Sequence, residues 1–111
     1  MVNEFLQAAG FVLNETYRRT RFPQPPKGKT YAVYSDDVTL EGPDDLPGLI
    51  RRHDVTVKMY APEPDDAREE ALETVLATAG VAWEKQDRYW LQEEQRYQTI
   101  YEFSYIEKRR E

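Results

Sequence analysis

The sequence predicts an α+β domain, a two-layer sandwich in which two helices cover one face of a mostly antiparallel sheet of four or five strands. Two observations predict it. Two segments, near residues 2–20 and 66–79, repeat apolar residues at the i, i+3 and i+4 spacing of an amphipathic helix. The closing segment has the two-residue period of a strand, with large side chains at Tyr97, Thr99, Tyr101, Phe103 and Tyr105. The predicted element order is α-β-(β)-β-α-β-β, and helices on one sheet face are its simplest two-layer packing.

The composition fits one globular domain. The chain has 111 residues, of which 40% are hydrophobic and 32% charged. It has no cysteine, which excludes disulfides and thiolate metal sites and is typical of a cytoplasmic protein. No apolar run approaches the roughly 20 residues that cross a bilayer. The first residues lack the basic and apolar stretches of a signal peptide, so none is expected.

The first helix is predicted over residues 2–20. Gly10 lies inside it and is expected to weaken it by about 1 kcal/mol without breaking it. Arg18, Arg19 and Arg21 would then stand at the helix C-terminus, where positive charge is favourable. The prolines of residues 23–26 predict an extended connector.

Three strands are expected in the middle of the chain. The first covers residues 29–35, and a turn at Asp36-Asp37 separates it from a short second strand at residues 38–41. Residues 42–48 predict a loop, because they contain two prolines and two glycines. The next strand covers residues 49–60 and is clearest from Asp54 onward, where apolar residues alternate.

The second helix should begin after Asp65 or Asp66, and Asp66 with Glu69 fits a capping box. It is expected to end near residue 79, with Gly80 in the left-handed position that follows many helices. Residues 81–91 predict a fourth strand, followed by a polar turn at 92–95. The closing strand would then return antiparallel to the fourth. Two helices can cover only one sheet face, so the other face is either exposed or meets a partner.

Charge is unevenly distributed along the chain. The formal net charge is −6. Residues 1–35 carry a net +3, residues 36–73 a net −8 and residues 74–111 a net −1. The acidic middle argues against a nucleic-acid backbone as the main ligand. A basic first third beside an acidic middle suits head-to-tail association of copies, and ordinary scatter of surface charge is the alternative.

Catalytic chemistry finds little support. The single histidine, His53, precedes Asp54 in a predicted strand, so the two side chains point to opposite faces and form no acid–base dyad. His53 is expected to be a surface or interface residue. The pairs Asp36-Asp37 and Asp44-Asp45 match no calcium-loop spacing, and turn formation explains them better than a metal. We therefore expect no enzyme activity, no cofactor and no metal.

The chain as a whole resembles the tail-terminator, or tail-completion, proteins of long-tailed bacteriophages and prophages. The resemblance lies in the order and character of five segments rather than in one motif: the N-terminal helix with Arg21-Phe22-Pro23, the strands 30–35 and 54–60, the acidic helix from Arg68 to Gly80-Val81, and the ending Tyr97–Phe103. The chain departs from the family at residues 42–48, where relatives carry a simpler hairpin.

The resemblance implies a structural role. Such proteins form a ring, usually of six copies, that caps the finished tail tube and offers a surface to the head connector. It implies three kinds of partner, namely other copies of the chain, the tail tube protein and connector proteins. No membrane and no sequence-specific nucleic acid are expected as partners, given the lack of a long apolar run and the acidic middle of the chain. The expected location is the tail or neck of the virion, and the bacterial cytoplasm during assembly.

The candidate contact residues for this role are charged: Arg18, Arg19, Arg21, Asp36, Asp37, Asp44, Asp45, Lys108, Arg109 and Arg110. Two other functions remain open. One is a different head-completion or connector-associated phage protein. The other is a non-viral α+β binding module, which would be a stable monomer with a ligand groove on its tyrosine-bearing sheet face.

Overall fold

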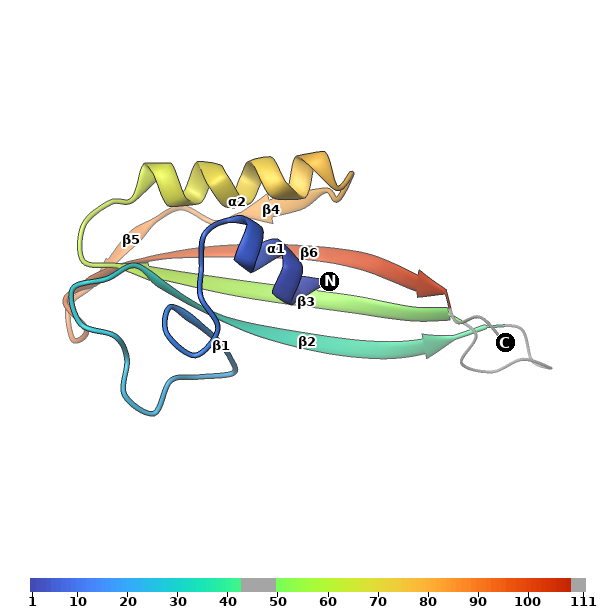
Figure 1. Ribbon diagram of the computed structural model, residues 1–111, viewed down its shortest axis with the longest axis horizontal. Helices are drawn as coiled ribbons and strands as arrows, with labels where there is room; N and C mark the ends of the chain where they lie inside the picture. Colours follow the sequence, from blue (N-terminus) through green and yellow to red (C-terminus); the bar gives the residue numbers. More distant parts are fainter. Residues whose placement is uncertain (43–49, 109–111) are drawn as a thin grey trace.

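The computed structural model describes residues 1–42 and 50–108, and it confirms the predicted α+β class. Figure 1 shows two helices on one side of a sheet. The elements are α1 (Val2–Ala8), β1 (Tyr17–Arg19), β2 (Tyr31–Glu41), β3 (Ile50–Ala61), α2 (Asp66–Thr78), β4 (Trp83–Lys85), β5 (Tyr89–Leu91) and β6 (Arg96–Lys108). The strand order is β1-β2-β3-β6-β4, with β5 also paired to β6. The sheet thus has six strands, more than the predicted four or five.

Three long strands form the centre of the sheet. β3 pairs antiparallel with β2 and with β6 along its whole length. The core lies between these strands and the helices, where the side chains of Leu6, Val57, Leu72, Leu76 and Tyr101 are fully buried. Burial of this apolar area is the main stabilising contribution to such a fold.

The alternation predicted for the closing strand is confirmed, and the buried face is now assigned. Thr99, Tyr101 and Phe103 point toward the helices and are buried, while Glu102 and Ser104 point away and are exposed. The ring of Phe5 in α1 meets Phe103 edge-on at 6.0 Å. The aromatic face of β6 is therefore the floor of the core.

The predicted N-terminal helix is much shorter than expected. It ends at Ala8 because Gly10 adopts φ +98° and the chain turns, with Phe11 N–H donating to the Leu6 carbonyl. A side chain at position 10 would also collide with Arg68, whose guanidinium donates to the Ala9 carbonyl at 2.8 Å. Gly10 therefore terminates the helix, and the prediction that the helix continues through it was wrong.

As a consequence, Arg18 and Arg19 do not stand at a helix end. They lie in β1, which pairs parallel with β2 through three residues. The residues after Gly10 that fitted the helical spacing divide between the core and the surface. Tyr17 is buried, whereas Val12 and Leu13 are each 49% exposed. Phe11, which did not fit that spacing, is buried.

The predicted turn at Asp36-Asp37 was also wrong. Both residues lie within the single strand β2, opposite Val55 and Asp54 of β3. The turn preference of aspartate is overridden because the ladder continues on both sides and Asp36 finds a hydrogen-bond partner in His53. The predicted loop at 42–48 lies, apart from Gly42, outside the described residues.

The second helix agrees closely with its prediction. Asp65 is the N-cap and accepts from the Arg68 N–H at 3.0 Å, and Gly80 has φ +74°. The Asp66–Glu69 capping box does not form, because Glu69 points into the molecule. The expected fourth strand is divided in two, β4 and β5, and the polar turn at 92–95 joins β5 to β6 as predicted.

The second sheet face is only partly covered. Near one end the connector lies over it, where the Phe22 ring meets Tyr31 edge-on at 5.5 Å and Tyr31 stacks on Tyr60. The Arg96 guanidinium lies 5.0 Å above the Tyr31 ring and donates to the Lys29 carbonyl. Farther along the strands, Asp37, Glu102 and Ser104 are exposed on this face.

Candidate assembly surface

The long strands extend beyond the elements that cover and flank them. On one side, β1 pairs with β2 only as far as Tyr34; on the other, β4 pairs with β6 only as far as Phe103. Figure 1 shows β2, β3 and β6 continuing past α1 as a three-stranded extension. We name this extension the distal ribbon: residues 36–41, 50–54 and 104–108.

The outer edge of β2 in the ribbon offers backbone hydrogen-bonding groups. Ala32 N–H and Tyr34 C=O already point outward, since they bond to Thr16 and Thr20. By the two-residue period of a strand, the groups of Val38 and Leu40 point the same way. Within the described chain they have no strand partner. An exposed strand edge of this kind is a ready template for another strand.

The ribbon also exposes apolar side chains on both faces. Val38 and Leu40 are 47% and 63% exposed on the same face as His53. Ile106 is 61% exposed on the opposite face. Apolar side chains at a projecting end, next to open strand edges, are typical of a surface that another protein covers.

A polar cluster holds the three ribbon strands together at the border of the core, where the Phe5 ring of α1 still meets Tyr105 edge-on at 6.4 Å. His53 of β3 lies with Nδ1 2.9 Å from the Asp36 carboxylate of β2, and its ring stacks at 4.4 Å on Tyr105 of β6. Its Nε2 lies 3.7 Å from Glu107 Oε1. His53 is only 9% exposed, so of the two expectations for it, a surface or an interface residue, the surface one was wrong. It does point away from Asp54, as predicted.

The cluster changes the acidity of Tyr105. Burial, followed by the nearby carboxylates of Asp36 and Glu107, raises the pKa of the Tyr105 phenol to about 12. The phenol therefore stays neutral at physiological pH. The cluster has a histidine between carboxylates but no nucleophile beside it, so its geometry favours strand cohesion over catalysis.

The face opposite the helices has a shallow hollow lined by acidic and hydroxyl side chains, among them Asp37, Asp54, Glu84, Glu102 and Ser104. Ser104 Oγ donates to Asp54 Oδ1 at 2.6 Å, and this bond, with the Arg52 guanidinium, lowers the pKa of Asp54. A carboxylate with a lowered pKa is a poor general base. Across residues 1–42 and 50–108, no group of three or more His, Asp or Glu side chains has metal-binding geometry.

An ionic network ties α2 to the sheet. The Glu69 carboxylate is buried, receives Lys85 and Arg88 at 2.9 and 3.0 Å, and accepts from the Thr99 hydroxyl. Glu73 accepts from the Tyr101 phenol at 2.8 Å, and burial together with this bond raises the pKa of Tyr101. Sequence reasoning missed this network. Glu69 was assigned to a helix cap, and its 3.6-residue phase with Leu72 and Leu76 was the available signal.

Six of the ten predicted contact residues lie in the described chain, in three places. Arg18, Arg19 and Arg21 lie on or beside β1, and Arg19 Nη2 donates to the Asp36 carbonyl at 3.3 Å. Asp36 and Asp37 lie in β2 on opposite faces, with the Asp36 carboxylate already bound to His53. Lys108 lies in β6 opposite Ile50. Asp44, Asp45, Arg109 and Arg110 lie outside the described residues.

Comparison with known proteins adds no relative, since no protein-family model and no curated protein matches this chain. In the part of the chain that the structure describes, no helix is long and apolar enough to cross a membrane.

Proposed function

We propose that this protein is a structural subunit of bacteriophage tail assembly, which caps the completed tail tube as a ring and helps to join the tail to the head connector. The distal ribbon is the observation that carries the proposal. It projects from the folded body, exposes Val38, Leu40 and Ile106, and leaves the β2 edge unpaired in the described chain.

In a monomer, ordering the ribbon costs more free energy than its own contacts contribute. Its residues bury little apolar surface, yet the chain loses backbone entropy of about 1–2 kcal/mol for every ordered residue. An open edge also exposes the protein to uncontrolled strand pairing. A subunit that docks into a larger structure offsets both costs, because the partner covers the edge and the apolar side chains. The resemblance of the chain, segment by segment, to phage tail-terminator proteins supports the tail tube as that larger structure.

The decisive experiment is electron microscopy of phage particles assembled without this protein. Tails of uncontrolled length would support tube capping. Free heads beside tails of normal length would instead assign the protein to another part of the neck. Normal infectious particles would exclude both.

Complementation with ribbon variants tests the role of the ribbon itself. Val38→Asn with Leu40→Asn should leave the protein folded but should not restore joined particles. Val12→Asn with Leu13→Asn is the matched control, since Val12 and Leu13 are each 49% exposed but lie away from the ribbon. The control should restore assembly to the wild-type level. Equal complementation by both double variants would count against the ribbon as a docking element.

A further inference from the structure

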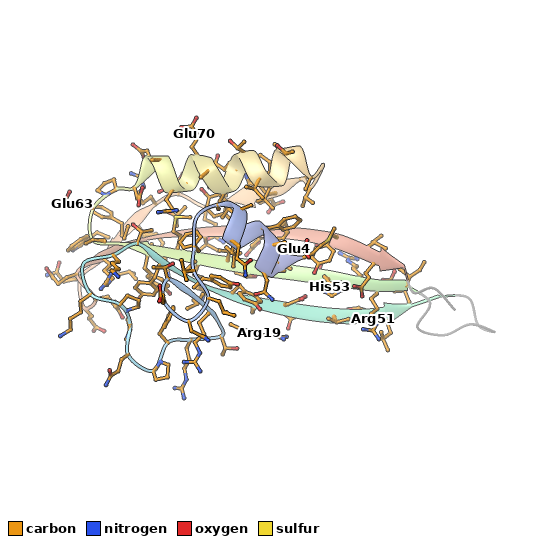
Figure 2. All side chains as sticks on the ribbon, in the orientation of Figure 1. Glu4, Arg19, Arg51, His53, Glu63 and Glu70 are labelled. Carbon is orange, nitrogen blue, oxygen red and sulfur yellow. The ribbon has the colours of Figure 1, made fainter. Side chains whose placement is uncertain are left out.

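The two flanks of the sheet carry opposite charge. β1 lies at one end of the strand order, while β4 and β5 lie beyond β6 at the other. Figure 1 shows β1 and the connector on one side and α2 with β4 and β5 on the opposite side. In Figure 2, the labelled side chains of Arg19 and Glu70 lie on these two sides. We name residues 17–30 the basic flank and residues 62–95 the acidic flank.

The basic flank contains five basic residues and no acidic residue. All five are exposed: Arg18, Arg19, Arg21, Lys27 and Lys29. Within the described chain, none of them comes within 4.0 Å of a carboxylate oxygen. Only Arg19 is engaged through its guanidinium, with the backbone carbonyl of Asp36. The flank therefore presents its positive charge to the outside.

The acidic flank contains ten acidic and three basic residues. All three cations are used internally. Lys85 pairs with Glu69 and Glu73, Arg88 pairs with Glu69 and Asp66, and Arg68 donates to the Ala9 carbonyl. Six exposed acidic residues form no ion pair with the described cations: Glu63, Glu70, Glu84, Asp87, Glu93 and Glu94.

We propose that the partner of each flank is a second copy of this chain, with the basic flank of one copy docked on the acidic flank of the next. Charge complementarity carries the inference, since the chain holds both halves of the match on opposite sides of one rigid sheet. The two surfaces differ, so the contact is head-to-tail and closes into a ring if the rotation between copies permits. The inference deepens the proposed function, on which it rests, by identifying the surfaces between ring subunits.

A contact of this kind must respond to salt. The Debye length shortens from about 10 Å at 0.1 M salt to about 3 Å at 1 M, so exposed charges then attract one another much less. We expect the purified protein to form dimers and larger species at low salt and high concentration, and to return to monomers in high salt. Sedimentation velocity measures both states.

Two neutralised variants test the direction of the contact. The first is Arg18→Gln with Arg21→Gln, and the second is Glu70→Gln with Glu84→Gln. Each should weaken self-association at low salt by at least tenfold. Mixed together, they should form a 1:1 heterodimer that does not grow, because each retains one functional flank. The matched controls are Lys58→Gln, compared with Arg18→Gln alone, and Glu4→Gln with Glu102→Gln, compared with the acidic-flank variant. They change the net charge equally outside the flanks and the ribbon and should associate like the wild type.

Three outcomes would overturn the inference. One is a wild-type protein that stays monomeric at low salt and high concentration. A second is a pair of controls that weaken association as much as the flank variants, which would show a response to net charge alone. The third is a monomer that binds duplex DNA through Arg18 and Arg21, which would assign the basic flank to nucleic acid. The proposed function fails separately, through normal particles in microscopy, so the two failures are distinguishable.

Discussion

The same three strands behave differently along their length. Under the helices, β3 and β6 bury Val57, Tyr101 and Phe103 in a close-packed core. Farther along, the strands keep their register, but Val38, Leu40 and Ile106 are exposed. A polar cluster around His53 forms the border between this exposed part and the core. Strand pairing alone therefore does not determine whether a strand is buried. The layer that covers its faces distinguishes the core part of these strands from the exposed part.

The largest expected contrast lies within β6. Phe103→Asp places an unpaired charge where the native side chain is 5% exposed, and it should destabilise the domain by more than about 4 kcal/mol. Ile106→Asp makes a similar change three residues later, at a site 61% exposed, and should shift stability by no more than about 0.5 kcal/mol. Urea denaturation followed by circular dichroism measures both. Similar losses for the two variants would show that the ribbon end of β6 is packed as tightly as the core.

The ionic network of the helix-covered half gives the next contrast. Glu69→Gln removes the charge that Lys85 and Arg88 share and should cost about 1–3 kcal/mol. Glu70→Gln, one residue later and exposed, should cost no more than about 0.5 kcal/mol. Thermal unfolding measures the difference. If the two variants have the same unfolding temperature, the network does not hold α2 on the sheet.

Alkaline pH should weaken the ribbon through Tyr105. Its pKa is raised from 10.0 to about 12, so folding favours the neutral phenol. This stabilisation is fully present below pH 10 and is lost as pH rises from 10 through 12. The stability advantage of the wild type over Tyr105→Phe should therefore shrink across that window. Tyr89→Phe, at a half-exposed site on β5, controls for loss of a hydroxyl. A constant difference between wild type and Tyr105→Phe would contradict the assignment.

The smallest effect should appear on the open face. Ser104→Ala removes the main bond that lowers the pKa of Asp54, so that pKa should rise toward its ordinary value with little change in stability. Arg52→Gln should also raise it, since the guanidinium lowers this pKa through its charge and through a hydrogen bond. An NMR pH titration of the Asp54 carboxyl carbon measures both changes. An unchanged Asp54 pKa in Ser104→Ala would show that the Ser104 hydroxyl does not stabilise the Asp54 carboxylate.

The second helix and the closing strand could be predicted because the apolar residues of each follow an uninterrupted period, and these two elements predict the fold class. The alternation through Tyr101 and Phe103 identifies the buried face of the strand, and Leu72 with Leu76 identifies the buried face of the helix. The N-terminal helix could not be bounded, because the apolar spacing continues past Gly10 and only the positive φ of Gly10 in the structure shows that the chain turns there.

The candidate surface was less predictable. Asp36 looks like a turn residue until His53, 17 positions away, is placed beside it. The unpaired β2 edge depends on where β1 stops, and no local pattern encodes that point. The charge asymmetry was visible in the sequence, but its placement on opposite flanks required the strand order.

The pairing of β3 with β6 has a consequence for the timing of synthesis. β3 ends at Ala61, whereas its second neighbour begins at Arg96 and is the last described strand to be made. At about 5–20 residues per second, a ribosome leaves β3 with one sheet edge unoccupied for several seconds. Until β6 arrives, the ribbon lacks its third strand and His53 lacks Tyr105. If the protein docks through the ribbon, only chains whose synthesis has passed β6 can dock. Partially synthesised subunits would then not block the assembly that the protein joins.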